Sequence, residues 1–393
     1  MLSAIAKHGG IVRSPLRGQD CEDTLRILQE LGARIETRQT GIEFFPSELF
    51  SPVAPLFCGN SGTTMRLLAG LIAGLGLNAE LVGDESLSRR PMRRVAEPLR
   101  LMGAEIEGDT PPLRLRGAAL KGIDYTLPVA SAQVKSAILL AGLFAKGKTV
   151  VREPVATRDH TERMLAGAGC SIEIKKNAIV LLPGRPERIE MRVPGDISSA
   201  SFLLIASALI GGPLTLKEVG INPSRTGILD VLKKVGVQLQ IENAREETGE
   251  PVADLFIPKR PDVLKSFQIA GDMVPRLIDE IPILAVLATQ CSGTTVIRDA
   301  GEMRVKESDR IEKVVTGLRA MGANVVPRED GMEITGPTPL LSGTIDAKGD
   351  HRIAMAFAVA GLIATGGTTI HNSDSVETSF PGFFDELRRL SFD

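Results

Sequence analysis

The chain has 393 residues, too many for one ordinary hydrophobic core, so its length predicts two or more domains. It is 43% apolar and 24% charged, which is typical of a soluble globular protein and argues against disorder. The 46 Lys and Arg nearly balance the 48 Asp and Glu, for a net charge of −2. This balance does not favour a nucleic-acid partner, so any anion site must come from local clustering.

The cysteines and histidines predict neither disulfides nor a metal centre. The four His are scattered, and the four Cys form no CxxC pair, which favours buried thiols in a reducing, cytoplasmic setting. The apolar stretches 197–216 and 353–364 are interrupted or too short to cross a membrane, and no signal peptide is visible. The cysteines are Cys21, Cys58, Cys170 and Cys291.

In chain order, one pattern returns about every 70 residues. An apolar helix rich in small residues ends in glycine and leads into a strand, and an amphipathic helix that also ends in glycine follows it. In the amphipathic helix of 309–326, the apolar residues recur at helical spacing. Six copies predict an α/β protein with two similar domains of three units each, over 1–194 and 195–393. The apolar copies are 1–12, 62–76, 133–151, 201–216, 281–297 and 353–370.

The first copy of the repeat is shorter than the others. "MLSAIAKHGG" at Met1 aligns with "LLIASALIGG" at Leu203, but only the second is preceded by a strand, a turn and a helix start, "VPGDISSASF". We therefore expect the first unit to be incomplete in this chain, by at least about ten residues.

Several cations are predicted at the starts of helices, where a positive charge opposes the helix dipole. That placement is favourable if an anion lies between the cation and the exposed N–H groups. The alternative for each is a surface charge paired with a nearby carboxylate. For Arg90 the helix is expected to begin at Pro91, and for Arg310 at an Asp309 cap. The cations are Arg66, Arg90, Lys135, Arg310 and Arg352.

Acidic residues lie among these cations. Asp279 and Glu280 precede an apolar helix, and Glu307 follows Lys306. A carboxylate with cationic neighbours stays ionised and can act as a base. The alternatives are a helix cap for Asp279 and a surface ion pair for Glu307. The stretch 142–149 matches a P-loop pattern, but its glycine lies inside a predicted helix and its Lys-Thr opens a strand, so we reject that match.

Six motifs together resemble 5-enolpyruvylshikimate-3-phosphate synthases, in that family's order and over almost the whole chain. The resemblance implies two domains of three βαββαβ units each, an inside-out α/β barrel with helices inside and the site in a cleft. It implies transfer of the enolpyruvyl group of phosphoenolpyruvate to the 5-hydroxyl of shikimate 3-phosphate, with release of phosphate and no cofactor or metal. The motifs are "GNSGTTMRLLAG", "RRPM", "SAQVKSA", "DEIP", "MRVKESDRI" and "DHRIAMA".

The resemblance also implies roles for individual residues. Asp279 takes the 5-hydroxyl proton, and Glu307 shares the proton transfers at the methylene carbon. Gly62 is expected where a larger residue would crowd the phosphoenolpyruvate site, so the resemblance implies sensitivity to glyphosate. The residues expected to hold shikimate 3-phosphate are Thr63, Ser131, Ala132, Gln133, Asp279 and Lys306. Those expected to hold phosphoenolpyruvate are Gly62, Arg90, Gln133, Arg310 and Arg352.

The chain departs from the family in one segment. In the family, a "PGDKS…R" segment lies just before the position that corresponds to Met1, and its Lys touches both substrates. The 393-residue chain does not contain this segment. Three interpretations stay open. The first is an active cytoplasmic synthase, expected to be a monomer without nucleic-acid or membrane partners, whose start lies upstream. The second is a truncated, non-catalytic relative that binds anions or a partner. The third is a UDP-N-acetylglucosamine enolpyruvyl transferase, disfavoured because the stretch 83–92 lacks the cysteine that such enzymes use as an acid.

Overall fold

The computed structural model describes residues 1–247 and 249–392. The chain divides into two compact units, each with its own hydrophobic core. Unit 1 comprises 1–193 and 247–250, and unit 2 comprises 194–246 and 251–393. No helix in the described part of the chain is long and apolar enough to span a membrane.

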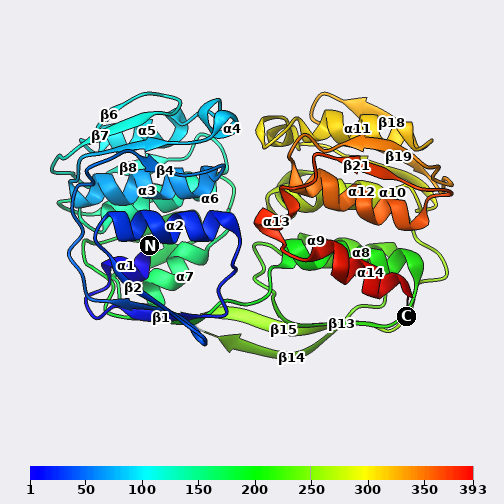
Figure 1. The fold of residues 1–393 in the computed structure, drawn as a ribbon, viewed down its shortest axis with the longest axis horizontal. Helices are drawn as coiled ribbons and strands as arrows, with labels where there is room; N and C mark the ends of the chain where they lie inside the picture. Colours follow the sequence, from blue (N-terminus) through cyan, green and yellow to red (C-terminus); the bar gives the residue numbers. More distant parts are fainter. Residues whose placement is uncertain (248, 393) are drawn as a thin grey trace. The chain divides into compact units, whose positions relative to one another are not determined.

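The elements of unit 1 alternate between helices and short strands (Figure 1). Its helices are α1 (Leu2–Ile5), α2 (Gln19–Glu30), α3 (Gly62–Leu75), α4 (Glu85–Ser88), α5 (Arg93–Leu101), α6 (Ala132–Gly142) and α7 (His160–Gly167). Its strands are β1 (Gly10–Arg13), β2 (Arg34–Arg38), β3 (Gly41–Phe45), β4 (Leu56–Phe57), β5 (Ala79–Val82), β6 (Glu105–Glu107), β7 (Leu113–Arg116), β8 (Asp124–Thr126), β9 (Thr149–Arg152), β10 (Ile172–Lys175), β11 (Ala178–Leu181) and β12 (Ile189–Arg192).

The strands of unit 1 form three four-stranded sheets among the described residues, in the orders β12-β1-β3-β2, β4-β5-β7-β6 and β10-β11-β9-β8. Each sheet has antiparallel partners and one parallel pair. In the first, β1 runs parallel to β12, with Gly10 opposite Ile189 and Arg13 opposite Arg192. The strands bury one face: in β7, Leu113 and Leu115 are buried while the residues that follow each are exposed.

Helices α3 and α6 of unit 1 lie between strand layers in Figure 1, and most residues of each are buried. Small residues allow this packing. A Cβ added at Gly70 of α3 would lie 2.2 Å from the carbonyl oxygen of Ala137 in α6. The two helix backbones therefore meet where neither can carry a larger side chain, which accounts for the small-residue stretches of the repeat.

Unit 2 repeats this plan (Figure 1). Its helices are α8 (Ile197–Ile210), α9 (Gly227–Val235), α10 (Ile281–Ala288), α11 (Arg310–Ala320), α12 (His351–Ile363), α13 (Val376–Ser379) and α14 (Phe383–Phe392), with 3-10 helices η1 (Gly271–Arg276), η2 (Ile278–Glu280) and η3 (Gly301–Val305). Its strands are β13 (Leu214–Gly220), β14 (Gln240–Glu247), β15 (Glu250–Ile257), β16 (Gln268–Ile269), β17 (Gly293–Ile297), β18 (Asn324–Arg328), β19 (Gly331–Gly336), β20 (Thr344–Asp346) and β21 (Thr369–His371).

The sheets of unit 2, among its described residues, have the orders β13-β15-β14, β16-β17-β19-β18 and β20-β21. The apolar helices α8, α10 and α12 form the interior and pack on one another. The amphipathic face predicted in α11 is confirmed, because Ile311, Val314 and Leu318 are each at most 1% exposed. The predicted α/β class is therefore confirmed.

Three details differ from the sequence predictions. The helix expected to begin at Pro91 begins instead at Arg93, and Met92 is its N-cap residue. Asp279 does not cap the apolar helix α10, whose N-cap residue is Glu280. Of the four cysteines, all unpaired, only Cys58 and Cys291 are fully buried, and burial raises the pKa of both thiols to about 12.

Candidate functional site

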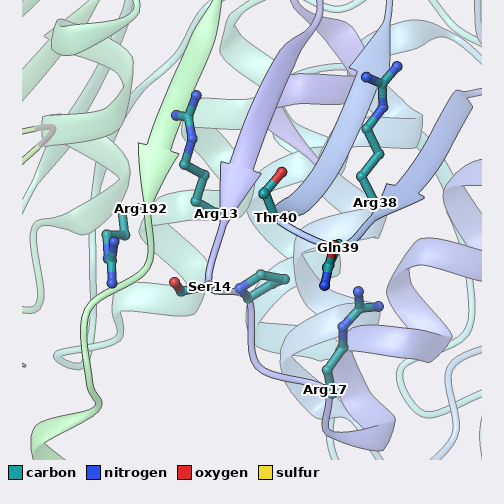
Figure 2. Close-up of a pocket in the computed structure, with 9 residues that line it drawn as sticks. Arg13, Ser14, Arg17, Arg38, Gln39, Thr40 and Arg192 are labelled. Carbon is teal, nitrogen blue, oxygen red and sulfur yellow. The ribbon is translucent and has the colours of Figure 1, made fainter.

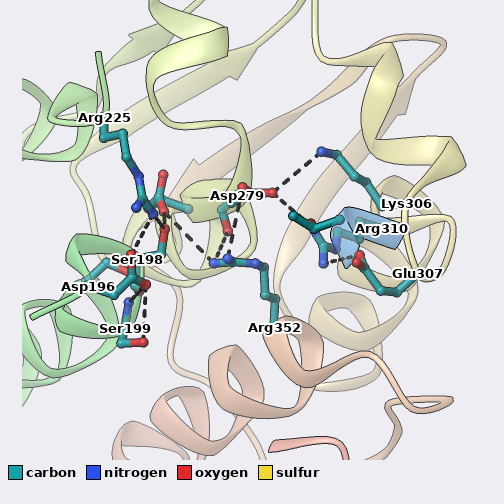
Figure 3. Close-up of polar contacts among 12 residues, drawn as sticks. Asp196, Ser198, Ser199, Arg225, Asp279, Lys306, Glu307, Arg310 and Arg352 are labelled. Carbon is teal, nitrogen blue, oxygen red and sulfur yellow. Dashed lines mark hydrogen bonds and ion pairs between the residues drawn. The ribbon is translucent and has the colours of Figure 1, made fainter. Parts of the chain in front are cut away.

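In unit 2 the predicted acid–base residues lie where the starts of α11 and α12 approach η2 (Figure 3). The local sequence accounts for both helix starts. Asp309 caps α11 by accepting a hydrogen bond from the backbone N–H of Glu312 at 3.0 Å. Asp350 occupies the corresponding position of α12 and accepts from the backbone N–H of Arg352 at 3.0 Å.

The Asp279 carboxylate is surrounded by three cations (Figure 3). Its Oδ1 lies 3.2 Å from Arg310 Nη1 and 3.7 Å from Lys306 Nζ, and its Oδ2 lies 4.0 Å from Arg352 Nη2. Asp279 is only 8% exposed, so these charges act through little water. The arrangement favours the ionised carboxylate, the form that a general base requires.

Arg310 is buried among carboxylates and is 1% exposed. Its Nε lies 2.9 Å from Asp350 Oδ2, and its Nη2 lies 2.5 Å from Glu307 Oε2. Burial alone would lower the pKa of Arg310, but the charges of Asp350, Glu307 and Asp279 raise it above its ordinary value. All three guanidinium nitrogens thus have carboxylate partners within unit 2.

His351 lies between Asp350 and Arg352 at the start of α12. Burial, followed by the positive charges of Arg352 and Arg310, lowers the pKa of its imidazole to about 4. His351 is therefore neutral at pH 7 and adds no positive charge to the cluster.

The residues predicted in unit 1 are joined by side-chain hydrogen bonds. Gln133 accepts from Arg66 Nη1 at 2.7 Å and donates through Nε2 to Thr63 Oγ1 at 2.7 Å. Arg90 donates through Nη2 to Asn60 Oδ1 at 2.5 Å. A Cβ added at Gly62 would lie 2.9 Å from Arg66 Nη1 and 3.4 Å from Arg90 Nη1. Unit 1 thus places Gly62 beside two guanidinium groups and joins Thr63 to Gln133.

Ser131 and Ala132 lie at the start of α6. The Ser131 hydroxyl caps the helix by accepting from the backbone N–H of Val134 at 3.4 Å. Ala132 is the first helical residue, and Gln133 follows it on the same turn. These residues expose a helix N-terminus, where the backbone N–H groups favour an anion.

Lys135 differs from the sequence expectation that it holds an anion. Its side chain is fully buried, with Nζ 3.0 Å from Glu153 Oε2 and 2.6 Å from Glu162 Oε1. Glu162 has a raised pKa, chiefly because burial opposes its charge. Lys135 therefore balances two interior carboxylates.

Sequence reasoning missed the groups that support the predicted residues. Asp350 is fully buried and bridges Arg310 and α12, yet in the sequence it reads only as a helix cap. Asn60 belongs to the turn "GNSGTT", where its amide reads as ordinary turn chemistry. In unit 2, Ser198 donates to Glu280 and accepts from Arg225, and nothing in the sequence connects these positions.

A separate hollow of about 510 Å³ lies on unit 1 and contains none of the predicted site residues (Figure 2). It is lined by Arg13, Ser14, Pro15, Arg17, Arg38, Gln39, Thr40, Gly41 and Arg192. Two of its guanidinium groups have carboxylate partners inside unit 1, since Arg17 lies 3.1 Å from Glu22 and Arg38 lies 2.7 Å from Glu43. Among the described residues, no group of three or more His, Cys, Asp or Glu could hold a metal ion.

Comparison with known proteins gives consistent matches. The family model described as EPSP synthase (3-phosphoshikimate 1-carboxyvinyltransferase) matches residues 1–387. A protein of that enzyme name from Geobacillus kaustophilus is 49% identical over 403 residues, covering 99% of this chain and 93% of that protein. Another from Brevibacillus brevis is 48% identical over 402 residues, covering 100% of this chain and 93% of that protein.

Solved structures agree. An EPSP synthase from Acinetobacter baumannii superimposes with a TM-score of 0.88 at 44% identity, covering 99% of this chain and 92% of the other. The enolpyruvyl transferase NikO from Streptomyces tendae gives a TM-score of 0.79 at 18% identity, over 100% of this chain and 91% of the other. At that identity the likeness shows a shared fold only.

Proposed function

This chain belongs to the EPSP synthase family, and from that premise we propose that it transfers the enolpyruvyl group of phosphoenolpyruvate to the 5-hydroxyl of shikimate 3-phosphate, with release of phosphate. The observation that carries the proposal is the family match over residues 1–387. The geometry around Asp279 supports it, because a carboxylate held among three cations suits proton transfer between anionic substrates.

The proposed reaction proceeds by addition and elimination. In the first step, Asp279 takes the proton of the 5-hydroxyl while the hydroxyl oxygen forms a bond to the central carbon of phosphoenolpyruvate. The methylene carbon of phosphoenolpyruvate gains a proton in the same step. In the second step a proton leaves that carbon, the carbon–carbon double bond re-forms, and phosphate departs with its bonding electrons. Glu307 shares the transfers at the methylene carbon, and its 2.5 Å contact with Arg310 holds its carboxylate in place.

Substrate binding is proposed along the lines of the motifs. The side chains and backbone at Thr63, Ser131, Ala132, Gln133, Asp279 and Lys306 hold shikimate 3-phosphate. Gly62, Arg90, Gln133, Arg310 and Arg352 serve phosphoenolpyruvate. We further propose a cytoplasmic monomer, which fits four unpaired cysteines in a reducing compartment.

Phosphate release in the presence of both substrates tests this function. We expect Asp279→Asn to lower kcat by about 10²- to 10⁴-fold, because the amide cannot accept the proton. Asp272→Asn is the control: Asp272 is an exposed residue of the neighbouring η1 and should leave kcat unchanged. Equal activity of Asp279→Asn and the parent chain would rule out Asp279 as the base.

The same assay on a chain extended upstream by the family's "PGDKS…R" segment tests the role expected for that segment. Higher turnover by the extended chain supports the proposed contact of its Lys with both substrates. Equal turnover by both chains contradicts that contact. No turnover by either chain contradicts the proposed function.

A further inference from the structure

Glu280, next to the proposed base, is a buried carboxylate without a part in the chemistry described above. It is 1% exposed. A carboxylate that is so poorly solvated requires polar partners, and the partners of Glu280 indicate its role.

A directed chain of hydrogen bonds runs from Arg225 through Ser198, both labelled in Figure 3, and ends at Glu280. Arg225 Nη2 donates to Ser198 Oγ at 2.8 Å and lies 2.6 Å from Asp196 Oδ1. Because a guanidinium can only donate, Ser198 must accept from Arg225, and its own hydroxyl hydrogen is left for Glu280 Oε1. Ser198 is itself 1% exposed, at the start of α8.

The same Glu280 oxygen faces Arg352. Arg352 Nη1 lies 3.9 Å from Glu280 Oε1 and donates to the backbone carbonyl of Asp279 at 3.3 Å. Across residues 1–247 and 249–392, Arg352 Nε and Nη2 make no hydrogen bond, and the Nη2 contact with Asp279 Oδ2 is 4.0 Å. The Nη1 group of Arg352 is thus oriented by protein oxygens, whereas Nε and Nη2 keep N–H groups that can donate to a ligand.

We propose that Glu280 is a positioning residue, held by Ser198 and Arg225, that orients Arg352 so that its remaining N–H groups receive the anionic group of phosphoenolpyruvate. The inference rests on the proposed function, because it assigns Arg352 to that substrate. A guanidinium oriented before binding loses less freedom when the anion arrives, so the arrangement affects affinity for this substrate in particular.

Two variants test the proposal, and each removes one link. Glu280→Gln removes the charge that faces Arg352, and Ser198→Ala removes the hydroxyl that holds Glu280. We expect each to raise KM for phosphoenolpyruvate about tenfold, as for loss of a hydrogen bond to a charged group. We expect KM for shikimate 3-phosphate to stay within about twofold and kcat within about threefold.

Ser201→Ala is the matched control. Ser201 is a fully buried serine one turn along the same helix, and its hydroxyl donates to the backbone carbonyl of Ser198 at 2.6 Å. It should leave both KM values unchanged. A thermal unfolding scan of each variant, followed by circular dichroism, shows whether the variant is folded. If Glu280→Gln does not fold, the KM values of Ser198→Ala test the proposal.

The outcomes separate this inference from the proposed function. If the parent chain turns over both substrates but neither variant changes KM for phosphoenolpyruvate, Glu280 does not position Arg352. An equal rise in both KM values also overturns the inference, because it indicates general damage. A parent chain that neither binds the substrates by calorimetry nor turns them over overturns the proposed function, and the inference with it.

Discussion

Arg310 and Arg352 differ in how freely each can meet a substrate. Arg310 is bound to carboxylates at distances of 2.5 to 3.3 Å on every nitrogen. Arg352 and Lys306 lie farther from the Asp279 carboxylate, at 4.0 and 3.7 Å. Because close ion pairs in a poorly hydrated site are costly to break, an arriving anion should bind Lys306 and Arg352 first, while Arg310 keeps Glu307 and Asp350 in place.

At the same scale, Gly62→Ala should weaken phosphoenolpyruvate binding. The added Cβ would lie 2.9 Å from Arg66 Nη1 and would displace that guanidinium, and Arg90 Nη1 is 3.4 Å away. We expect KM for phosphoenolpyruvate to rise about tenfold, and inhibition by glyphosate to weaken, with little change in thermal stability. In Gly167→Ala the new methyl meets nothing within 4 Å, and kinetics like the parent's are expected. An unchanged KM in Gly62→Ala would contradict the assignment of Gly62.

His351 should make stability depend on pH. Its folded pKa of about 4 lies below the ordinary 6.5, so the unfolded chain binds the proton more readily. Its neutral form therefore contributes fully above pH 6.5, and stability is lost as the pH falls from 6.5 towards 4. We expect this residue to account for about 1 to 3 kcal/mol of that loss in urea titrations at pH 7 and 4.5.

Two variants isolate the effect. His351→Gln should flatten the loss of unfolding free energy between pH 7 and 4.5. His371→Gln, which changes an exposed histidine, should show the same loss as the parent chain. Identical profiles for all three proteins would show that His351 is not the titrating group.

The sequence marked candidate residues but not the groups that contact them. The motifs named Asp279, Arg310 and Arg352, because each stands beside a recognisable helix start. Arg310 and Asp350 are 40 residues apart, and Ser198 and Glu280 are 82 apart, so only the folded chain brings them together.

Among the elements, α6 shows how a helix buried nearly all round is fixed in orientation. Apolar attraction has no preferred direction, whereas an ion pair joins particular side chains and so adds to the orientation that packing provides. Lys135 of α6 is bound to Glu153, just after β9, and to Glu162 of α7. Its ion pairs therefore align α6, and with it the helix start at Ser131.

Lys135→Met should accordingly destabilise the protein. The apolar chain fills the space, but two buried carboxylates lose their cation, at a cost of about 3 to 5 kcal/mol in unfolding free energy. Adding Glu162→Gln should restore part of that stability, since one buried charge is removed. The control is Lys146→Met, at an exposed lysine near the end of α6. Urea unfolding that does not distinguish Lys135→Met from Lys146→Met would show that the ion pairs contribute nothing.

The periodicity of the elements was readable from the sequence, because helices that alternate between apolar and amphipathic types end in glycine before each strand. The boundaries of these elements were harder to predict from the sequence. At Pro91, the sequence favoured a helix start that the structure places at Arg93. For Lys135, a charge at a helix start was read as an anion ligand, since no local pattern reveals a buried carboxylate pair.

At the scale of the molecule, two units with separate cores should lose structure separately. Gly70→Ala forces a methyl to within 2.2 Å of the Ala137 carbonyl oxygen, inside unit 1. We expect amide exchange in α3 and α6 to accelerate about ten- to hundredfold, as overpacking permits more frequent opening, while α8 and α10 keep their protection. Hydrogen exchange followed by mass spectrometry measures both regions in one sample. Equal acceleration in the two units would mean that they open together.

The pairing of β1 with β12 has a consequence for the newly made chain. About 175 residues separate the two strands, so during synthesis at about 5 to 20 residues per second β1 waits roughly 9 to 35 seconds for this neighbour. In that interval one edge of β1 offers unsatisfied peptide groups to any other nascent strand. The first sheet of unit 1 is thus the last of the three described sheets of that unit to be completed during synthesis, and chaperone dependence should be greatest before residue 189 emerges.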